Sequence, residues 1–232
     1  MDWNTATLAE LQSGLRSGSF SSSDLLEAHI ETIAEVNPAV NGLVADRFEK
    51  ARKEASTADE RLKQGGTDLP PLLGIPCTIK EFIGVEGQPQ TGGVLWRKDV
   101  VAEQDATVVR RLRDAGAIVI GTTNIPEGGL WLETYNAIYG RTNNPWDTSR
   151  TSGGSSGGEG ALVATGAVPF GLGSDVGGSI RIPAAFCGTV GHKPTGGLVP
   201  NTGHYPEGML TKAGGRYLTV GPLTRTVDDA WT

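Results

Sequence analysis

A dense cluster of glycines between residues 153 and 178 constrains this chain more than any other feature of its sequence. Ten of the 34 glycines in 232 residues fall inside this window, mostly in two runs at residues 153–158 and 171–178. Glycine lets backbone N–H groups turn toward a common point and form a concave anion-binding surface. The glycines follow no Gly-X-Y period and no low-complexity tract, which excludes collagen and simple disorder. Two serines at the ends of these glycine-rich loops suggest acyl transfer, and ordinary Gly/Ser turns remain an equally weighted alternative.

Elsewhere the chain alternates apolar segments with amphipathic ones. Two early helices are predicted, one capped by Thr5 and one that begins at Ser22 and ends before Asn37-Pro38. A third helix is predicted from Arg47 to Lys63. Beyond residue 70 the expected elements are strand 72–80, helix 105–115, strand 117–121, helix 157–165, strand 167–172 and a short helix from Ser179. Strands that alternate with helices predict an α/β protein whose sheet has helices on both faces.

The last residues of the chain begin a further helix. Thr226 can cap it, and Asp228 and Asp229 lie in its first turn, where negative charge is favourable. Because the sequence stops one turn into this helix, we expect the chain to be the N-terminal part of a longer polypeptide.

Charge and cysteine content limit the classes of function. The chain has 26 acidic and 20 basic residues, a formal charge of -6, so no nucleic-acid partner is expected. Cys77 and Cys187 lie in apolar segments and are expected to be buried free thiols of a reducing compartment. The first residues do not resemble a signal peptide, and no apolar run reaches the roughly 18 residues of a membrane helix. We therefore expect a cytoplasmic protein without a membrane segment.

Three specific loop motifs fail on spacing or context. Residues 153–157 satisfy G-x-S-x-G, but residues 144–150 before them are loop-like, whereas a nucleophile elbow follows a strand. No lysine directly follows a glycine, which excludes a Walker A loop. A dinucleotide fingerprint that starts at Gly171 fails because Val176 occupies its third glycine position. Phosphate binding is therefore a minor option.

A serine nucleophile needs a base, and the sequence offers histidines and a lysine. His29 is predicted in mid-helix and exposed, while His192 and His204 lie in Gly/Pro-rich segments where packing or exposure is the ordinary outcome. Lys80 ends the apolar segment 72–79. Burial lowers the pKa of a lysine, so Lys80 could serve as a neutral base. Taken alone, a lysine at the end of a strand more often reaches water.

The order and context of Lys80, Ser155 and Ser179 resemble those of the amidase signature family. The similarity includes the 24-residue interval between the serines and residues 173–184. It implies an α/β amidase signature fold, with a mixed central sheet covered by helices on both faces and the C-terminal part missing. Residues 1–232 would be the N-terminal portion of one such domain, with a helical entry segment over about 1–66 and a catalytic α/β core over about 67–232.

The resemblance also implies an activity. In this family a Ser-Ser-Lys triad hydrolyses amides through an acyl-enzyme intermediate, and the matching residues are Ser179 as nucleophile, Ser155 as bridging serine and Lys80 as base. The peptide bond between Gly154 and Ser155 is expected to be cis. Residues 191–206 resemble the fatty acid amide hydrolase branch more than the branch that supplies a subunit of glutamyl-tRNA amidotransferase.

Around the nucleophile, the resemblance assigns an oxyanion hole. Its donors would be the backbone N–H groups of Val176, Gly177, Gly178 and Ser179. Asp175 and Arg181 flank this loop and are expected to orient it without a direct chemical role. The implied partner is a small-molecule amide, with no cofactor and no metal, and a homo-oligomer is left open.

Two other classes of function compete with amide hydrolysis. The first is an amidotransferase component that uses ammonia released at the same triad inside a complex. The second is a non-catalytic remnant whose sheet edge binds a partner. The sequence does not identify the amide, and it does not establish whether a chain of this length is active alone.

Overall fold

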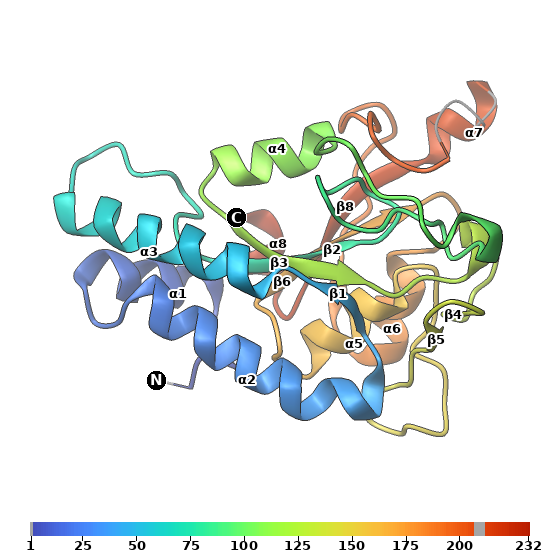
Figure 1. Cartoon of the computed structure of the whole chain (residues 1–232), viewed down its shortest axis with the longest axis horizontal. Helices are drawn as coiled ribbons and strands as arrows, with labels where there is room; N and C mark the ends of the chain where they lie inside the picture. Colours follow the sequence, from blue (N-terminus) through green and yellow to red (C-terminus); the bar gives the residue numbers. More distant parts are fainter. Residues whose placement is uncertain (1, 207–211) are drawn as a thin grey trace.

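A six-stranded mixed sheet with the order β1-β3-β2-β6-β8-β7 lies at the centre of the computed structural model, which describes residues 2–206 and 212–232 (Figure 1). Strands β2, β3 and β6 run parallel, while β1, β8 and β7 pair antiparallel with their neighbours. This is the mixed sheet that the resemblance predicted. The strands are β1 (Leu43–Asp46), β2 (Pro76–Lys80), β3 (Ile118–Thr123), β6 (Phe170–Asp175), β7 (Val190–Gly191) and β8 (Thr219–Thr224).

Helices and a small hairpin surround this sheet. The helices are α1 (Leu8–Ser17), α2 (Ser22–Val40), α3 (Phe48–Gln64), α4 (Thr107–Asp114), α5 (Gly157–Ala164), α6 (Arg181–Cys187), α7 (Lys212–Tyr217) and α8 (Val227–Trp231). Strands β4 (Tyr135–Asn136) and β5 (Gly140–Arg141) form the hairpin, and η1 (Leu95–Arg97) and η2 (Glu127–Gly129) are short 3₁₀ turns.

The alternation of side chains along β3 divides the core into two clusters. Val119 packs in a cluster with α1 and α4, whereas Ile118 and Ile120 pack in another with α2, α3 and α5. Figure 1 shows α4 on one side of the sheet and α2 and α5 on the other. Helices therefore cover both faces, as predicted, and β3 is buried along its whole length.

The structure corrects several predicted boundaries. Helix α2 continues through Pro38 to Val40, because the proline falls in the last turn, where it removes one backbone bond. The Asn37 side chain then accepts the N–H groups of Gly42 and Leu43 and fixes the exit of the chain. Strand β6 extends to Asp175, three residues past its predicted end. Strands β1 and β8 were not predicted, since β1 is only four residues long and Gly221-Pro222 inside β8 resembles a turn.

His29 was predicted to be exposed, and this was wrong. Its side chain is fully buried within α2, and neither ring nitrogen makes a hydrogen bond of normal geometry to a described residue. Burial, together with the nearby charge of Arg225, lowers the pKa of His29 to about 4. His29 is therefore a neutral residue of the core. Cys77 and Cys187 are buried free thiols, as predicted.

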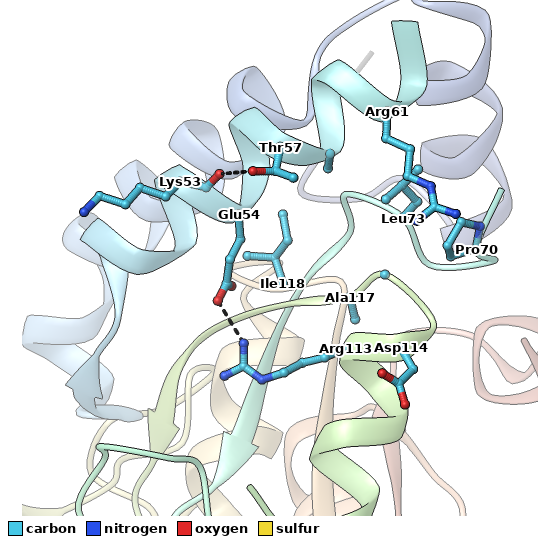
Figure 2. Close-up of a pocket in the computed structure, with 12 residues that line it drawn as sticks. Lys53, Glu54, Thr57, Arg61, Pro70, Leu73, Arg113, Asp114, Ala117 and Ile118 are labelled. Atoms are coloured by element: carbon cyan, nitrogen blue, oxygen red, sulfur yellow. Dashed lines mark hydrogen bonds and ion pairs between the residues drawn. The ribbon is translucent and has the colours of Figure 1, made fainter. Parts of the chain in front are cut away.

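A cavity of about 380 Å³ opens between α3 and α4 (Figure 2). Its walls include Glu54 and Arg61 from α3, Arg113 from α4, and Ile118, the first residue of β3. Ligands of parallel sheets bind beyond the carboxyl ends of the strands. This cavity lies at the opposite end, where β3 begins, and is therefore separate from the site described below.

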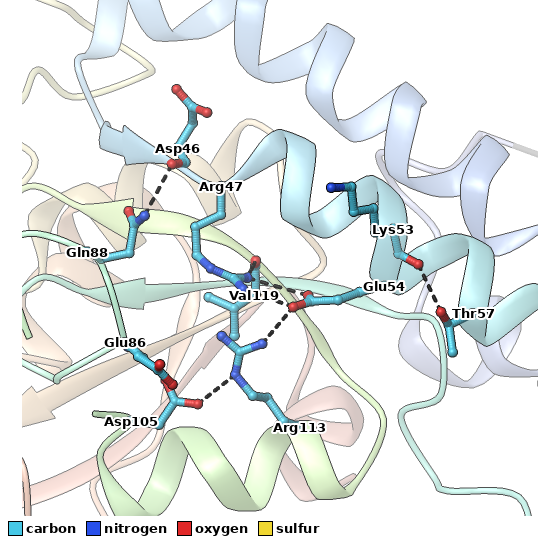
Figure 3. A network of polar contacts seen from close by, with 10 residues as sticks. All are labelled: Asp46, Arg47, Lys53, Glu54, Thr57, Glu86, Gln88, Asp105, Arg113 and Val119. Carbon is cyan, nitrogen blue, oxygen red and sulfur yellow. Dashed lines mark hydrogen bonds and ion pairs between the residues drawn. The ribbon is translucent and has the colours of Figure 1, made fainter. Parts of the chain in front are cut away.

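A chain of charged side chains connects α3 to α4 beside this cavity (Figure 3). Arg47 and Arg113 both contact Glu54 Oε1 at 2.8 Å, and Arg113 Nε lies 2.8 Å from Asp105 Oδ2. Arg47 also donates to the carbonyl oxygen of Val119 in β3. Only 3% of the Arg47 side chain is exposed, so Glu54 neutralises a cation that water cannot reach.

Replacing Glu54 by alanine is expected to lower the free energy of unfolding. Removing one partner of a fully buried ion pair costs about 3 to 5 kcal/mol. Because 32% of the Glu54 side chain is exposed, we expect about 2 kcal/mol, measured by urea unfolding. The matched control is Glu27→Ala, which breaks the exposed pair with Arg52 and should cost less than about 1 kcal/mol. Equal losses in the two variants would contradict this account.

Candidate active site

The carboxyl ends of the three parallel strands bring the candidate catalytic residues together. Lys80 is the last residue of β2, Thr123 ends β3 and Asp175 ends β6. The loop before α5 carries Ser155, and the loop between β6 and α6 carries Ser179. Ser155 and Ser179 follow Lys80 by 75 and 99 positions in the sequence, yet all three residues lie at one edge of the sheet.

Lys80 is fully buried and contacts the predicted bridging serine directly. Its Nζ atom lies 2.6 Å from Ser155 Oγ and 3.3 Å from the carbonyl oxygen of Ser174. Burial lowers the pKa of Lys80 to about 7, although the negative charges of Asp175 and Glu159 oppose this shift. About half of the Lys80 side chains are then neutral at pH 7 and can accept a proton. The water-exposed strand-end alternative does not describe this lysine.

Ser155 follows a cis peptide bond with Gly154, as the resemblance implied, and is buried. The next residue, Ser156, joins the two serine-bearing loops. Its N–H group donates to the carbonyl oxygen of Ser179 at 3.0 Å. Its hydroxyl lies 3.3 Å from both the carbonyl oxygen and the N–H group of Ser174. No role for Ser156 was predicted from the sequence.

Ser179 is partly exposed and lies in the turn that precedes α6. Its backbone is fixed against the Ser155 loop through the bond from Ser156. In the described part of the chain its hydroxyl makes no hydrogen bond, to Ser155 or to any other residue. The structure thus joins Lys80 to Ser155 directly and brings Ser179 beside them through the backbone, with its hydroxyl unengaged.

Asp175 organises the loop that contains Ser179. Its buried carboxylate accepts the N–H groups of Gly178 at 2.8 Å and Ile180 at 3.0 Å, and it pairs with the Arg181 guanidinium at 2.9 Å. Burial alone would raise the pKa of Asp175, but the bonds from Arg181 and these N–H groups hold it at about 2. A permanently ionised Asp175 holds the turn, which is the orienting role expected for it.

The predicted oxyanion donors differ in what they contact. Val176 and Gly177 are exposed, and their N–H groups have no acceptor among the described residues, nor does that of Ser179. The N–H group of Gly178 is already bound by Asp175. Gly178 has φ +125°, and a Cβ there would lie 2.6 Å from Ile182, so this position requires glycine for its backbone shape.

Glu159, in the first turn of α5, is a buried acid that was not predicted from the sequence. Thr78 donates to one of its carboxylate oxygens at 2.5 Å and Thr123 donates to the other at 2.8 Å. A Cβ on Gly171 would lie 1.8 Å from this carboxylate, so only glycine leaves room for it. Burial raises the pKa of Glu159 to about 7, against the two threonine bonds and the charge of Lys80. Glu159 therefore connects α5 to β2, β3 and β6 beneath the site.

For the amide hydrolysis that the resemblance implies, replacing Glu159 by glutamine is expected to shift the pH dependence toward lower pH. The ionised carboxylate favours the charged form of Lys80, so its removal lowers the pKa of the base. The shift should stay below about one unit, because Glu159 is itself about half protonated at pH 7. The measurement is the acidic limb of kcat/KM against pH. A limb that moves toward higher pH would contradict this arrangement of charges.

Comparison with known proteins identifies the family. The amidase family model matches residues 24–232 of the chain. The chain belongs to the amidase signature family. Fatty-acid amide hydrolase 2-A of Danio rerio is 44% identical to it over 226 residues, covering 95% of this chain and 42% of that protein. The predicted similarity to fatty acid amide hydrolases is thereby confirmed.

Two further comparisons show the breadth of this amidase signature family. A glutamyl-tRNA(Gln) amidotransferase subunit of a Geobacillus strain is 42% identical over 224 residues, covering 96% of this chain and 44% of that protein. The crystal structure of a bacterial aryl acylamidase of the amidase signature family superposes with a TM-score of 0.88 at 35% identity, covering 97% of this chain and 46% of that one. The chain spans less than half the length of the curated relatives it matches.

Metal-binding clusters and membrane-spanning helices are both absent from the described residues. Among residues 2–206 and 212–232, no three His, Cys, Asp or Glu side chains converge so that they could hold a metal ion. Within the same residues, no helix is long and apolar enough to cross a bilayer.

Proposed function

We propose that this chain carries the catalytic centre of an amide hydrolase, with Ser179 as nucleophile, Ser155 as bridging serine and Lys80 as base. The observation that carries the proposal is the contact of 2.6 Å between the buried Lys80 Nζ and Ser155 Oγ. A strand-end lysine with no catalytic task would reach water, whereas this one is buried beside a hydroxyl and has a pKa near 7.

In the proposed first step, neutral Lys80 accepts the proton of Ser155 while Ser155 accepts the proton of Ser179. The Ser179 oxygen forms a bond to the amide carbon, which becomes a tetrahedral oxyanion. The proton then returns along the same path to the leaving nitrogen, the C–N bond breaks, and an acyl-enzyme remains. Water repeats the sequence and releases the carboxylate. The Ser179 hydroxyl has no competing partner among the described residues, so it can turn toward Ser155 without breaking a bond.

The oxyanion would form beside the turn that Asp175 organises. In this conformation the N–H groups of Val176, Gly177 and Ser179 are free to donate to it, while that of Gly178 keeps the turn in shape. Preorganised donors of this kind contribute about 3 to 4 kcal/mol each to transition-state stabilisation. A Cβ on Gly177 would meet no described protein atom within 4 Å, so a glycine there leaves the approach open for a substrate.

Exposed apolar side chains favour a substrate with an apolar group. Leu130, Trp131 and Leu132 are 88%, 58% and 55% exposed. The backbone of Leu132 lies 3.0 Å from where a Cβ on Gly154 would be, so this segment borders the Ser155 loop. Large apolar groups at the surface beside a reactive site mark a binding region. The similarity to fatty-acid amide hydrolase 2-A supports the same substrate class.

The test is a panel of amides offered to the 232-residue chain. Primary amides with acyl chains of two to sixteen carbons are compared with glutamine, and ammonia release is measured. Hydrolysis that increases with acyl length supports the proposal. Ammonia release from glutamine alone supports the amidotransferase alternative, and no release from any amide supports the non-catalytic alternative.

A further inference from the structure

We infer that His204 is a positioning residue of the catalytic centre, which closes the pocket around Lys80 Nζ against water. The inference rests on the proposed function, in which Lys80 must be neutral to act. It concerns a residue for which the sequence indicated only packing or exposure.

The hydrogen bonds of Ser174 place His204 next to the base. His204 is 6% exposed, and its Nε2 atom lies 2.7 Å from Ser174 Oγ. The carbonyl oxygen of the same Ser174 accepts from Lys80 Nζ at 3.3 Å. One residue of β6 thus contacts His204 through its side chain and Lys80 through its backbone.

The aromatic ring of Phe82 lies close to both Lys80 and His204. The Phe82 ring centroid lies 5.1 Å from Lys80 Nζ and 5.8 Å from the centroid of the His204 ring. The Tyr205 ring stacks on the Phe82 ring, with the two centroids 5.8 Å apart. Phe82 therefore lies over the amine, and the rings of His204 and Tyr205 both pack against Phe82.

The backbone keeps His204 in this position. Tyr205 N–H donates to the carbonyl oxygen of Phe82 at 2.8 Å, and Gly84 N–H donates to that of Gly203 at 3.0 Å. Gly203 has φ +84°, and a Cβ there would lie 2.7 Å from Ala106, so the turn before His204 requires glycine. This segment is more than 120 residues from Lys80 in sequence, yet it pairs with the chain directly after it.

The charges around Lys80 explain why its pKa depends on uncharged neighbours that exclude water. Glu159 and Asp175 both favour the charged ammonium form, and desolvation opposes them. His204 adds no charge of its own, because burial and then the nearby Lys80 charge lower its pKa to about 3. A cavity at position 204 would admit water beside Nζ and remove part of that desolvation. The neutral fraction of Lys80 would then fall at pH 7.

The test compares His204→Ala, His204→Gln and Ser174→Ala with His192→Ala, which removes an exposed histidine and is the control. For His204→Ala we expect the acidic limb of kcat/KM to move up by at least one pH unit, with a loss of at least about fivefold at pH 7 that is recovered at pH 9. His204→Gln keeps a nitrogen donor near Ser174 and should stay within half a unit of the parent chain. Ser174→Ala should fall between them, and His192→Ala should not shift.

A second readout does not depend on activity. Chain labelled with ¹³C-lysine reports the titration of Lys80 Cε by NMR, assigned with a Lys80→Met variant. If Lys80 titrates near pH 7 and this pKa is higher in His204→Ala, the inference is supported even when no amide is hydrolysed. The absence of hydrolysis would overturn only the proposed function. If folded His204→Ala leaves both the acidic limb and the Lys80 titration unchanged, the inference is overturned. If His204→Ala does not fold, the same two unchanged readouts in Ser174→Ala overturn it.

Discussion

Replacing Ser179 by alanine is expected to lower kcat/KM for amide hydrolysis by about 10⁴-fold or more, because no other hydroxyl can form the acyl-enzyme. The fold should be unaffected, since the Ser179 hydroxyl makes no hydrogen bond to a described residue and the loop is held through Asp175 and the Ser179 carbonyl oxygen. The measurement is the steady-state rate with the best amide of the panel, together with a thermal unfolding curve.

Controls for this variant use other serines. Ser155→Ala should also lose several orders of magnitude, because it removes the proton path between Ser179 and Lys80. Ser19→Ala, at an exposed position, should match the parent chain. If Ser179→Ala kept more than a tenth of the activity, Ser179 would not be the nucleophile.

Replacing Lys80 by methionine is expected to lower kcat/KM by about 10³-fold or more and to abolish its acidic limb. Methionine occupies a similar volume in the pocket without a proton acceptor. In the parent chain the base must be neutral and its pKa is about 7, so the rate should be level above pH 8. It should fall about tenfold per unit below pH 7, to about one hundredth at pH 5. The measurement is kcat/KM from pH 5 to pH 9.5.

The outcome of this pH series separates Lys80 from other bases. An acidic limb that persists near pH 7 in Lys80→Met would assign it to another group, of which Glu159 is the nearest candidate by its pKa. If the rate of the parent chain shows no limb near pH 7 and still rises at pH 9, Lys80 is solvated and keeps its ordinary pKa.

The local signals in the sequence predicted most helices because their causes are local. Thr226 caps α8 as expected, and α3 and α5 lie within a residue of their predicted bounds. The misplaced elements depend on distant partners. Strand β6 extends through Gly173 because it pairs with β8, where Gly173 faces Gly221. No property of residues 173–175 alone indicates that pairing.

In the candidate site, too, residues that depend on distant partners were missed. Family resemblance identified Lys80 and Ser155, and the structure brings them into contact. Glu159 and His204 were missed because their surroundings are assembled from distant segments. The space for Glu159 depends on Gly171, twelve residues later, and the bond of His204 depends on Ser174, thirty residues earlier. A buried acid or histidine looks like a surface residue until such partners are known.

Lys80 and Ser155 are proposed to activate Ser179 as a nucleophile, and covalent labelling of the chain distinguishes this from any other reactive residue. The 232-residue chain is treated with a fluorophosphonate, digested, and the modified residue is located by mass spectrometry at several pH values. We predict one adduct, on Ser179, whose rate of formation rises with pH to a plateau above about pH 7 and is lost in Ser179→Ala and Lys80→Met. An adduct on another residue, or labelling at the parent rate in Lys80→Met, would contradict the account.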